Sequence, residues 1–417
     1  MKKLIAIVLT LVMVLGLASG CKKADSGTAT DTGSTDTEST ETTTGGGETY
    51  DLKVWGAQEE QTLLAEMVEA FKAAHPENTY NIELGVVGEP DCFKTYSEDP
   101  EAAADVFWFA NDQLRDFVNA GGLYEVTRNK DDIVSRNLPG SIEGATMNDK
   151  LYAYPATADN GYFLYYDKSV LSEEDVQSLD TILEKSNAAG KKVFMDVSNG
   201  WYIASFFLGN GGKLTLSADG KQECDFNNAA GVAVGEAIKK FTADPAFLTG
   251  DDDVLKGGIG GTISAGVSGT WNAEAVASAL GDNYAAAKLP TFTVDGKQVQ
   301  MASFGGYKLV GVNSLTKAPV AAMDLADFLT NEENQIKRFE ARKIGPSNIK
   351  ASESDAVKAD VALAALAAQS AYALPQNDVI ASYWTPAEAF GTAMETKDYS
   401  KDVQTLLNEM VAQIQEG

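Results

Sequence analysis

The side chains that most often carry nucleophilic, metal or phosphate chemistry are scarce in this chain. Its one histidine, His75, lies directly before Pro76 at the end of a helical pattern, a place more typical of a capping or surface residue than of a catalytic base. A metalloprotease helix needs two histidines, and the sequence has no Gly-x-x-x-x-Gly-Lys loop. Cys92 and Cys224 lie far apart, their pairing is left open by the sequence, and alone they do not form a zinc cage. We therefore expect no metal site and no cofactor.

Tryptophans and acidic residues are the remaining groups with a chemistry of their own. Trp201, Trp271 and Trp384 lie in contexts rich in Gly, Ser, Thr and Asn, which favours exposure at a cleft. Trp55 and Trp108 lie within strand patterns and are predicted to be core. An indole offers a large, rigid apolar face, and a carboxylate forms strong charge-assisted hydrogen bonds. A pyranose ring, with an apolar C–H face and a rim of hydroxyls, needs both kinds of group.

Strands and helices alternate along the part of the chain that must position these residues. Strand patterns cover 50–55, 80–86, 105–109, 161–166, 192–197 and 262–268. Helical patterns cover 59–74, 323–341 and 403–415. Asp219-Gly220 and Asp295-Gly296 are hairpin signals. Strand–helix–strand alternation predicts an α/β fold with a largely parallel sheet.

The N-terminal residues predict export and anchoring. Two lysines precede an apolar run from Leu4 to Leu17 and three small residues, which is the layout of a secretory signal peptide over residues 1–20. Cys21 follows directly and resembles the lipidated cysteine of a bacterial lipobox, although Ala18 stands where that motif usually has leucine. We expect lipid on Cys21 and a disordered Ser/Thr-rich tether over residues 21–48, because its composition cannot bury enough apolar surface to order the chain.

Size and charge narrow the class of the folded part. About 370 residues follow the tether, more than one hydrophobic core usually spans, so two lobes are expected. The formal net charge is −27. Nucleic-acid binding needs clustered lysine and arginine, so this charge argues against a nucleic-acid partner and against direct adhesion to anionic lipid. Solubility is the simplest interpretation of the acidity.

Several short stretches follow one another in a specific order. They are Leu52 to Trp55, Asp105 to Asp112, Leu151 to Pro155, Tyr165 to Lys168, Ser268 to Trp271, Phe328 to Glu333 and Ala381 to Trp384. Each is weak alone, but their order and spacing over residues 50–417 resemble the extracellular solute-binding proteins of carbohydrate ABC importers. Within that family the resemblance is to the maltose/maltodextrin-binding branch.

The resemblance implies a two-lobed, periplasmic-binding-protein-like (type II) α/β fold with a hinge and a ligand cleft between the lobes. The first lobe is expected over 50–157 plus 305–355, and the second over 158–304 plus 356–417. Such a chain is a substrate-binding lipoprotein and not an enzyme. It captures an oligosaccharide, above all maltose or maltodextrin, and delivers it to the permease subunits of the ABC transporter. We expect a monomer on the outer face of the membrane of a Gram-positive-type cell, held by the lipid anchor.

Ligand contacts carried over from this family form an aromatic and a polar set. The aromatic positions are Phe109, Trp201, Trp271 and Trp384. The polar positions are Glu59, Glu60, Asp112, Gln113, Asp159, Asn160 and Asn199. Trp108 replaces Phe109 if the register slips by one residue. Gln113 stands where maltose binders often have arginine, and Glu60 replaces a lysine, so the identity of the sugar stays open.

Two other interpretations remain. Two carboxylates that flank a sugar are also what a glycoside hydrolase requires, so Asp112 and Asp159 could act as its acid and its nucleophile or base. A peptide-binding lipoprotein of the same general fold is the other, and would have a wider and less aromatic cleft. Asp112 also precedes a helical pattern over 113–118, where an N-cap role competes with ligand contact.

Overall fold

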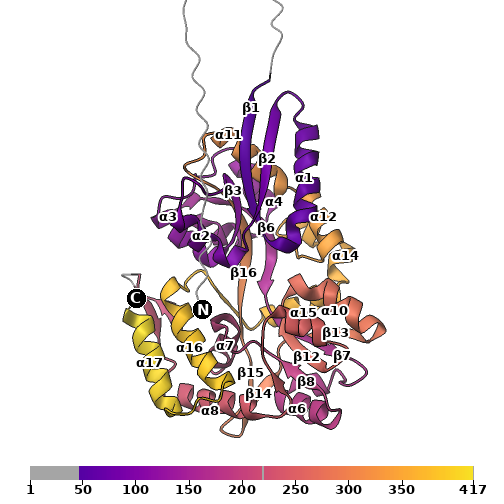
Figure 1. Cartoon of the computed structure of the whole chain (residues 1–417), viewed down its shortest axis with the longest axis vertical. Coiled ribbons are helices and arrows are strands. Elements are labelled where there is room, and N and C mark those ends of the chain that lie inside the picture. The colour runs from indigo at the N-terminus through magenta and orange to yellow at the C-terminus, as the bar shows by residue number, and fades with distance from the viewer. Residues whose placement is uncertain (1–46, 218–219, 417) are drawn as a thin grey trace, which may run out of the picture. The chain divides into compact units, whose positions relative to one another are not determined.

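The computed structural model describes residues 47–217 and 220–416. The predicted signal peptide, Cys21 and the predicted tether up to residue 46 lie outside the described residues. Two large sheets, each flanked by helices, dominate the described part, and three two-stranded sheets accompany them (Figure 1). None of the described helices combines the length and the apolarity that a membrane span requires.

The first sheet has the strand order β17-β16-β3-β1-β2, and β6 also pairs with β16. Its strands are β1 (Thr49–Gly56), β2 (Thr79–Val86), β3 (Val106–Ala110), β6 (Ala153–Gly161), β16 (Ser303–Val312) and β17 (Ala373–Pro375). β1 runs parallel to β2 and β3, whereas β16 runs antiparallel to β3 and β6. Every residue of β3 is buried, as an unbroken apolar run in a central strand requires.

Helices flank this sheet, and we call the sheet and these helices the first lobe. They are α1 (Gln61–Ala74), α2 (Cys92–Glu98), α3 (Leu114–Asn119), α4 (Lys130–Arg136), α5 (Pro139–Gly144), α11 (Pro319–Leu329), α12 (Glu332–Arg342), α13 (Ile349–Ser352) and α14 (Asp355–Lys358). The short strands β4 (Thr146–Met147) and β5 (Lys150–Leu151) pair beside them. One hydrophobic core unites the sheet with α1 and α11.

The second sheet has the order β11-β8-β12-β7-β13. Its strands are β7 (Phe163–Asp167), β8 (Lys192–Phe194), β11 (Phe247–Leu248), β12 (Ile263–Ser268) and β13 (Tyr284–Ala287). β8 is parallel to β11 and β12, and β7 is antiparallel to β12 and β13. Both sheets are therefore mixed. The predicted α/β class is confirmed, but the sheets are less parallel than predicted, because β16 runs antiparallel to β3 and β6, and β7 runs antiparallel to β12 and β13.

The second sheet and its flanking elements form what we call the second lobe. Its helices are α6 (Leu179–Ala188), α7 (Gly200–Gly209), α8 (Ala229–Ala243), α9 (Asp252–Gly258), α10 (Ala273–Leu280), α15 (Val361–Ser370), α16 (Trp384–Glu395) and α17 (Val403–Glu416). Two hairpins join them, β9 (Leu214–Leu216) with β10 (Gln222–Cys224) and β14 (Thr291–Val294) with β15 (Lys297–Gln300). The cores of this lobe are distinct from that of the first lobe.

The hairpin signals correspond to observed turns. Asp295 and Gly296 have φ angles of 49° and 76° between the antiparallel strands β14 and β15. A two-residue turn with both φ angles positive matches the twist of a hairpin. Gly220 has a φ of 81° between β9 and β10, while Asp219 lies outside the described residues.

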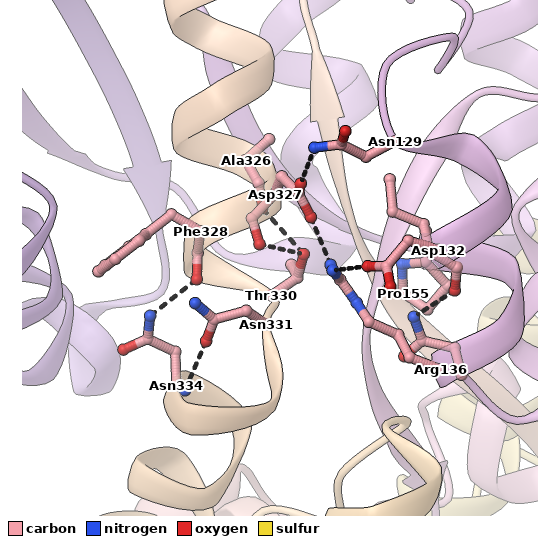
Figure 2. A network of polar contacts seen from close by, with 12 residues as sticks. Asn129, Asp132, Arg136, Pro155, Ala326, Asp327, Phe328, Thr330, Asn331 and Asn334 are labelled. Atoms are coloured by element: carbon pink, nitrogen blue, oxygen red, sulfur yellow. Dashed lines mark hydrogen bonds and ion pairs between the residues drawn. The ribbon is translucent and has the colours of Figure 1, made fainter. Parts of the chain in front are cut away.

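The predicted single helix over 323–341 is wrong, because the chain breaks at Thr330 and Asn331 between α11 and α12 (Figure 2). Asn331 has an extended backbone, and its side chain accepts a hydrogen bond from the backbone N–H of Asn334 at 2.9 Å. An asparagine N-cap of this kind starts a new helix. Asn334 Nδ2 in turn donates to the carbonyl of Phe328 at 2.7 Å, which stabilises the end of α11.

Cys92 and Cys224 are both free thiols, each buried in the core of a different lobe. Burial raises the pKa of the Cys224 thiol to about 12 and that of Cys92 well above its usual value. Because the thiolate is the reactive form, both thiols should resist an aromatic disulfide reagent in the native protein. In a Cys21→Ser variant, we expect two thiols to react only after denaturation. Rapid reaction of the native protein would contradict this expectation.

Candidate ligand-binding site

Trp201 and Asp112 come from different lobes and are joined by one glutamine. Trp201 lies in the first turn of α7, and Asp112 lies in a 3-10 turn, η3 (Asn111–Gln113), at the end of β3. Gln376 follows β17. Its Nε2 donates to Asp112 Oδ1 at 2.7 Å, and its Oε1 accepts from Trp201 Nε1 at 3.0 Å. The predicted stacking residue and the predicted hydroxyl acceptor therefore belong to one hydrogen-bonded chain.

Trp271 of the second lobe lies beside Trp201. Its ring lies 5.8 Å from that of Trp201 at an interplanar angle of 40°. Its Nε1 donates to Asp252 Oδ2 at 2.8 Å, which fixes the orientation of the indole. Trp201, Trp271 and Trp384 are all partly exposed and only border the core, as their sequence contexts predict. Two adjacent indoles with exposed surface are suited to stacking against sugar rings.

Asp159 is buried next to Trp271. Its Oδ2 accepts from Thr270 Oγ1 at 2.5 Å and from the backbone N–H of Gly345 at 2.8 Å. Its Oδ1 is buried without a hydrogen-bond partner. A buried carboxylate oxygen without a donor is unusual and marks a place where a donor can be accommodated.

Asn160 lies where three polar side chains approach Gly306 of β16. A Cβ on Gly306 would come within 2.5 Å of Asn111 Oδ1, and within 3.3 Å of both Asn160 Nδ2 and Gln376 Oε1. Asn111 Oδ1 also accepts from the backbone N–H of Tyr307 at 2.8 Å. Glycine at position 306 thus provides the space that these amides occupy.

Glu60 is held by arginines of α12. Arg338 Nε lies 3.1 Å from Glu60 Oε2, and Arg342 Nε lies 4.0 Å from Oε1. Burial alone raises the pKa of Glu60, but the two guanidinium groups outweigh it and the pKa lies below its ordinary value. The neighbouring Glu59 is exposed, and its backbone carbonyl accepts from Arg342. Glu60 is therefore already paired within the protein, whereas Glu59 is exposed.

Lys308 of β16 is a charged residue that the sequence reasoning missed. Its Nζ lies 3.4 Å from Glu89 Oε1 and 5.7 Å from the centroid of the Trp271 ring. Burial lowers its pKa, but the surrounding carboxylates, among them Glu89 and Asp159, more than compensate, so the pKa is raised and the ammonium is charged. A lysine within an otherwise apolar strand, at Tyr307-Lys308-Leu309, was the available signal.

Asn199 lies at the start of α7, and Trp384 is the first residue of α16. Asn199 is the N-cap of that helix, and its side chain accepts from the backbone N–H of Trp201 at 3.0 Å. A Cβ on Gly200 would lie 3.5 Å from Trp384 Cε3, so the Trp384 ring packs beside Gly200. Asn199 thus positions Trp201, and its amide oxygen is occupied by this capping bond.

Two predicted contacts are internal in this structure. Phe109 is completely buried and packs on Phe107 and Phe117 at centroid distances of 6.2 and 4.9 Å, so it presents no ring face. The same burial applies to Trp108, as predicted. Gln113 is buried, accepts from the N–H of Phe93 at 2.8 Å, and donates to the carbonyls of the Glu89 turn. Both residues are internal because all of β3 is buried and Gln113 of η3, directly after it, is buried as well. The proposed site therefore does not include Phe109 and Gln113.

Asp112 is partly exposed and is the N-cap of neither η3 nor α3. Burial raises its pKa to about 6, even though hydrogen bonds from Gln376 and from backbone N–H groups favour the charged form. With Oδ1 bound to Gln376, the carboxylate can still accept from a ligand hydroxyl through Oδ2. Acceptance is strongest when the group is ionised.

The described part of the chain holds no metal-binding cluster, and two hollows in it contain none of the residues of this site. Within 47–217 and 220–416, no three His, Cys, Asp or Glu side chains are grouped as metal ligands would be. A cavity of about 200 Å³ lies between α6, α8 and β14, and a hollow of about 580 Å³ is lined mainly by residues of β1 and β2; neither contains a predicted contact. The arrangement of indoles, amides and carboxylates is suited to binding a polyhydroxylated ligand.

Known proteins with similar sequences are extracellular solute-binding proteins. Residues 66–365 match the family model of the bacterial extracellular solute-binding proteins. The chain is 29% identical to the galactooligosaccharide-binding protein of Bacillus subtilis (strain 168) over 360 residues, which are 81% of this chain and 83% of that protein.

Solved structures agree over most of the chain. A structure with acarbose shares 32% identity and a TM-score of 0.80, over 88% of this chain and 99% of the other. The ligand-free maltodextrin binding protein MalE1 from L. casei BL23 shares 25% identity and a TM-score of 0.74, over 88% of this chain and 100% of the other. These matches confirm the two-lobed, periplasmic-binding-protein-like fold. The chain belongs to the bacterial extracellular solute-binding protein family.

Proposed function

We propose that this protein captures an oligosaccharide between its two lobes and delivers it to the permease of an ABC importer. The observation that carries the proposal is the pair of partly exposed indoles, Trp201 and Trp271, joined through Gln376 to the Asp112 carboxylate. The family membership and the oligosaccharide-binding relatives support the same conclusion. Isothermal titration with a panel of oligosaccharides tests it, and heat of binding to none of them would contradict it.

Hinge closure is the proposed mechanism. We propose the lobe boundaries 50–157 plus 305–355 and 158–304 plus 356–417. β1, β2 and β3 of the first sheet and all five strands of the second sheet support them, whereas β6 and β16 cross a boundary and β17 of the first sheet lies beyond residue 355. β6 leads directly into β7, and β16 returns from β15 to the first sheet, so both can act as hinge strands (Figure 1). A ligand that contacts both lobes favours the closed arrangement by its difference in affinity for the two states.

The sugar is proposed to be a maltodextrin, with a galactooligosaccharide as the alternative. The galactooligosaccharide-binding relative is 29% identical, and a maltotriose-binding protein of Pyrococcus abyssi is 24% identical over 310 residues. We expect the correct ligand to raise the melting temperature. At a ligand concentration a hundredfold above Kd, binding adds about 3 kcal/mol to the free energy of unfolding. A thermal shift with maltotriose but not with galactotriose would support maltodextrin, and the reverse result would assign the alternative.

Anchoring is proposed at Cys21, which lies outside the described residues. Extracellular location follows the family, and the lipid would keep the binding protein close to the permease, where a monomer is sufficient. Mass spectrometry of the mature protein should find diacylglycerol on Cys21. An unmodified N-terminal cysteine would contradict the anchor but not the binding function.

A glycoside hydrolase remains the second candidate, and its basis is the presence of Asp112 and Asp159. The relatives are binding proteins, and Thr270 and the Gly345 amide bind the Asp159 carboxylate on Oδ2. We expect no release of reducing sugar from maltodextrins or galactooligosaccharides. Release that disappears in Asp159→Asn would establish the enzyme.

Ligand affinity should depend on pH through Asp112. Its pKa of about 6 in the folded protein lies above the ordinary aspartate value, so the group is ionised above pH 6 and protonated below it. If the ionised form accepts a sugar hydroxyl, affinity is greatest above pH 6 and falls as the pH drops, by at most about tenfold per pH unit. Asp112→Asn should bind more weakly at pH 7.5 and lose this dependence. An unchanged pH profile in that variant would exclude Asp112 as the titrating contact.

A further inference from the structure

Gln376 is buried between the lobes, yet its side chain is not part of either hydrophobic core. It is 3% exposed. Its amide uses both ends, because Nε2 donates to Asp112 of the first lobe and Oε1 accepts from Trp201 of the second lobe. An amide can do this because it carries a donor and an acceptor in one rigid plane. Glutamate and leucine lack the donor, and leucine also lacks the acceptor.

The surroundings of Gln376 are built to hold it. Gly306 leaves the space in which Gln376 Oε1 lies, since a Cβ there would be 3.3 Å from this oxygen. The following residue Asn377 accepts a hydrogen bond from Asn111, beside Asp112. On the other side Gln222 of β10 donates to the carbonyl of Asp378 at 3.1 Å. Residues 376–378 are thus attached to both lobes, and within this segment Gln376 connects the two predicted ligand contacts.

We propose that Gln376 is a positioning residue that couples the Asp112 carboxylate to the Trp201 indole across the two lobes. This inference rests on the proposed sugar-binding function of those two residues. Gln376 orients the carboxylate so that Oδ2 is left for the ligand, and it fixes the rotation of the indole through its N–H. Movement of one lobe against the other then changes both contacts together, which links ligand geometry to the hinge.

Loss of Gln376 should be visible in the titration of Asp112. The hydrogen bond from Gln376 favours the ionised carboxylate, so its removal raises the pKa. Asp116 of α3 also acts on Asp112 and disfavours its ionisation, whereas the backbone N–H groups of Asp112 and Gln113 favour it. These groups are unchanged in a Gln376→Leu variant, so its effect can be assigned to the glutamine.

The first experiment follows the Asp112 carboxyl by NMR against pH in the protein without sugar, with wild type, Gln376→Leu and Gln376→Glu. We expect a higher midpoint in Gln376→Leu, and a still higher one in Gln376→Glu, which adds a like charge. Gln222→Leu is the matched control, because it loosens the same segment from β10 without touching Asp112. Its midpoint should equal that of wild type. Equal midpoints in all variants, or an equal rise in the control, would overturn the proposal.

The second experiment is a double-mutant cycle on oligosaccharide affinity with Asp112→Asn and Gln376→Leu. We expect Gln376→Leu to weaken binding about tenfold and the double variant to lose less affinity than the product of the two single losses, because part of the effect of Gln376 acts through the Asp112 carboxylate. Strict additivity would overturn the coupling. If wild type binds no oligosaccharide, the proposed function fails, while the NMR titration still decides whether Gln376 controls Asp112.

Discussion

Replacing Trp271 or Trp384 by alanine is expected to weaken oligosaccharide binding by about thirtyfold or more, equivalent to about 2 kcal/mol, as is usual for a buried aromatic contact at the centre of an interface. Each indole borders the core of the second lobe and is partly exposed. An exposed face is available for a sugar, and an alanine methyl cannot replace its area. Titration calorimetry at pH 7.5 with the oligosaccharide that gives the largest thermal shift measures the loss.

Phenylalanine and a distant tryptophan provide the controls for this experiment. Trp271→Phe keeps an aromatic face but loses the bond to Asp252, so its affinity should lie between those of wild type and Trp271→Ala. Trp55 of β1 is also partly buried, but it packs near Phe107 in the first lobe at 6.4 Å. Trp55→Ala should lower stability and leave affinity unchanged within about twofold. Unchanged affinity in Trp271→Ala and Trp384→Ala, with folding intact, would remove these rings from the site.

The elements that the sequence predicted well are those whose signals are local. The alternation in β1 and the Asp-Gly turn between β14 and β15 depend on neighbouring residues, and both appear in the structure. Trp201 and Trp271 follow small and polar residues, Trp384 follows Ala381-Ser382-Tyr383, and all three are partly exposed. The break between α11 and α12 also had a local signal in Thr330-Asn331, but apolar periodicity on both sides obscured it.

Other parts of the site depend on contacts that no local pattern contains. Gln376 is 264 residues from Asp112 in the chain, and nothing around it distinguishes it from a surface glutamine. Lys308 lies in a strand that would ordinarily exclude charge, and only the fold shows that Glu89 is its partner. Family matching placed Phe109 in the site, but burial along all of β3 takes the ring into the core. A motif thus transfers the position of a residue more reliably than the direction of its side chain.

Glu60→Ala is expected to be the most destabilising substitution at the edge of the site. It leaves Arg338, which is 2% exposed, without its carboxylate partner. Removing one member of a buried ion pair costs about 3 to 5 kcal/mol, because the remaining charge is uncompensated. Arg338 also lies over the Trp108 ring, 4.2 Å from its centroid. Because this contact still stabilises the guanidinium charge in the variant, we expect a loss at the lower end of that range. Urea unfolding gives the free energy of unfolding.

The pH dependence of the free energy of unfolding distinguishes the contribution of the Glu60 charge from that of its packing. The pKa of Glu60 is lowered in the folded protein, so its ion pair stabilises the fold above the unfolded-state pKa of glutamate and is lost as the pH falls through the folded-state value. The difference between wild type and Glu60→Gln should therefore be full at pH 7 and shrink toward acid pH. Lys337→Ala on the exposed side of α12, where Lys337 pairs with Glu333, is the matched control and should cost less than about 1 kcal/mol. A Glu60→Gln difference that is the same at pH 7 and at pH 3.5 would show that shape, and not charge, makes Glu60 necessary.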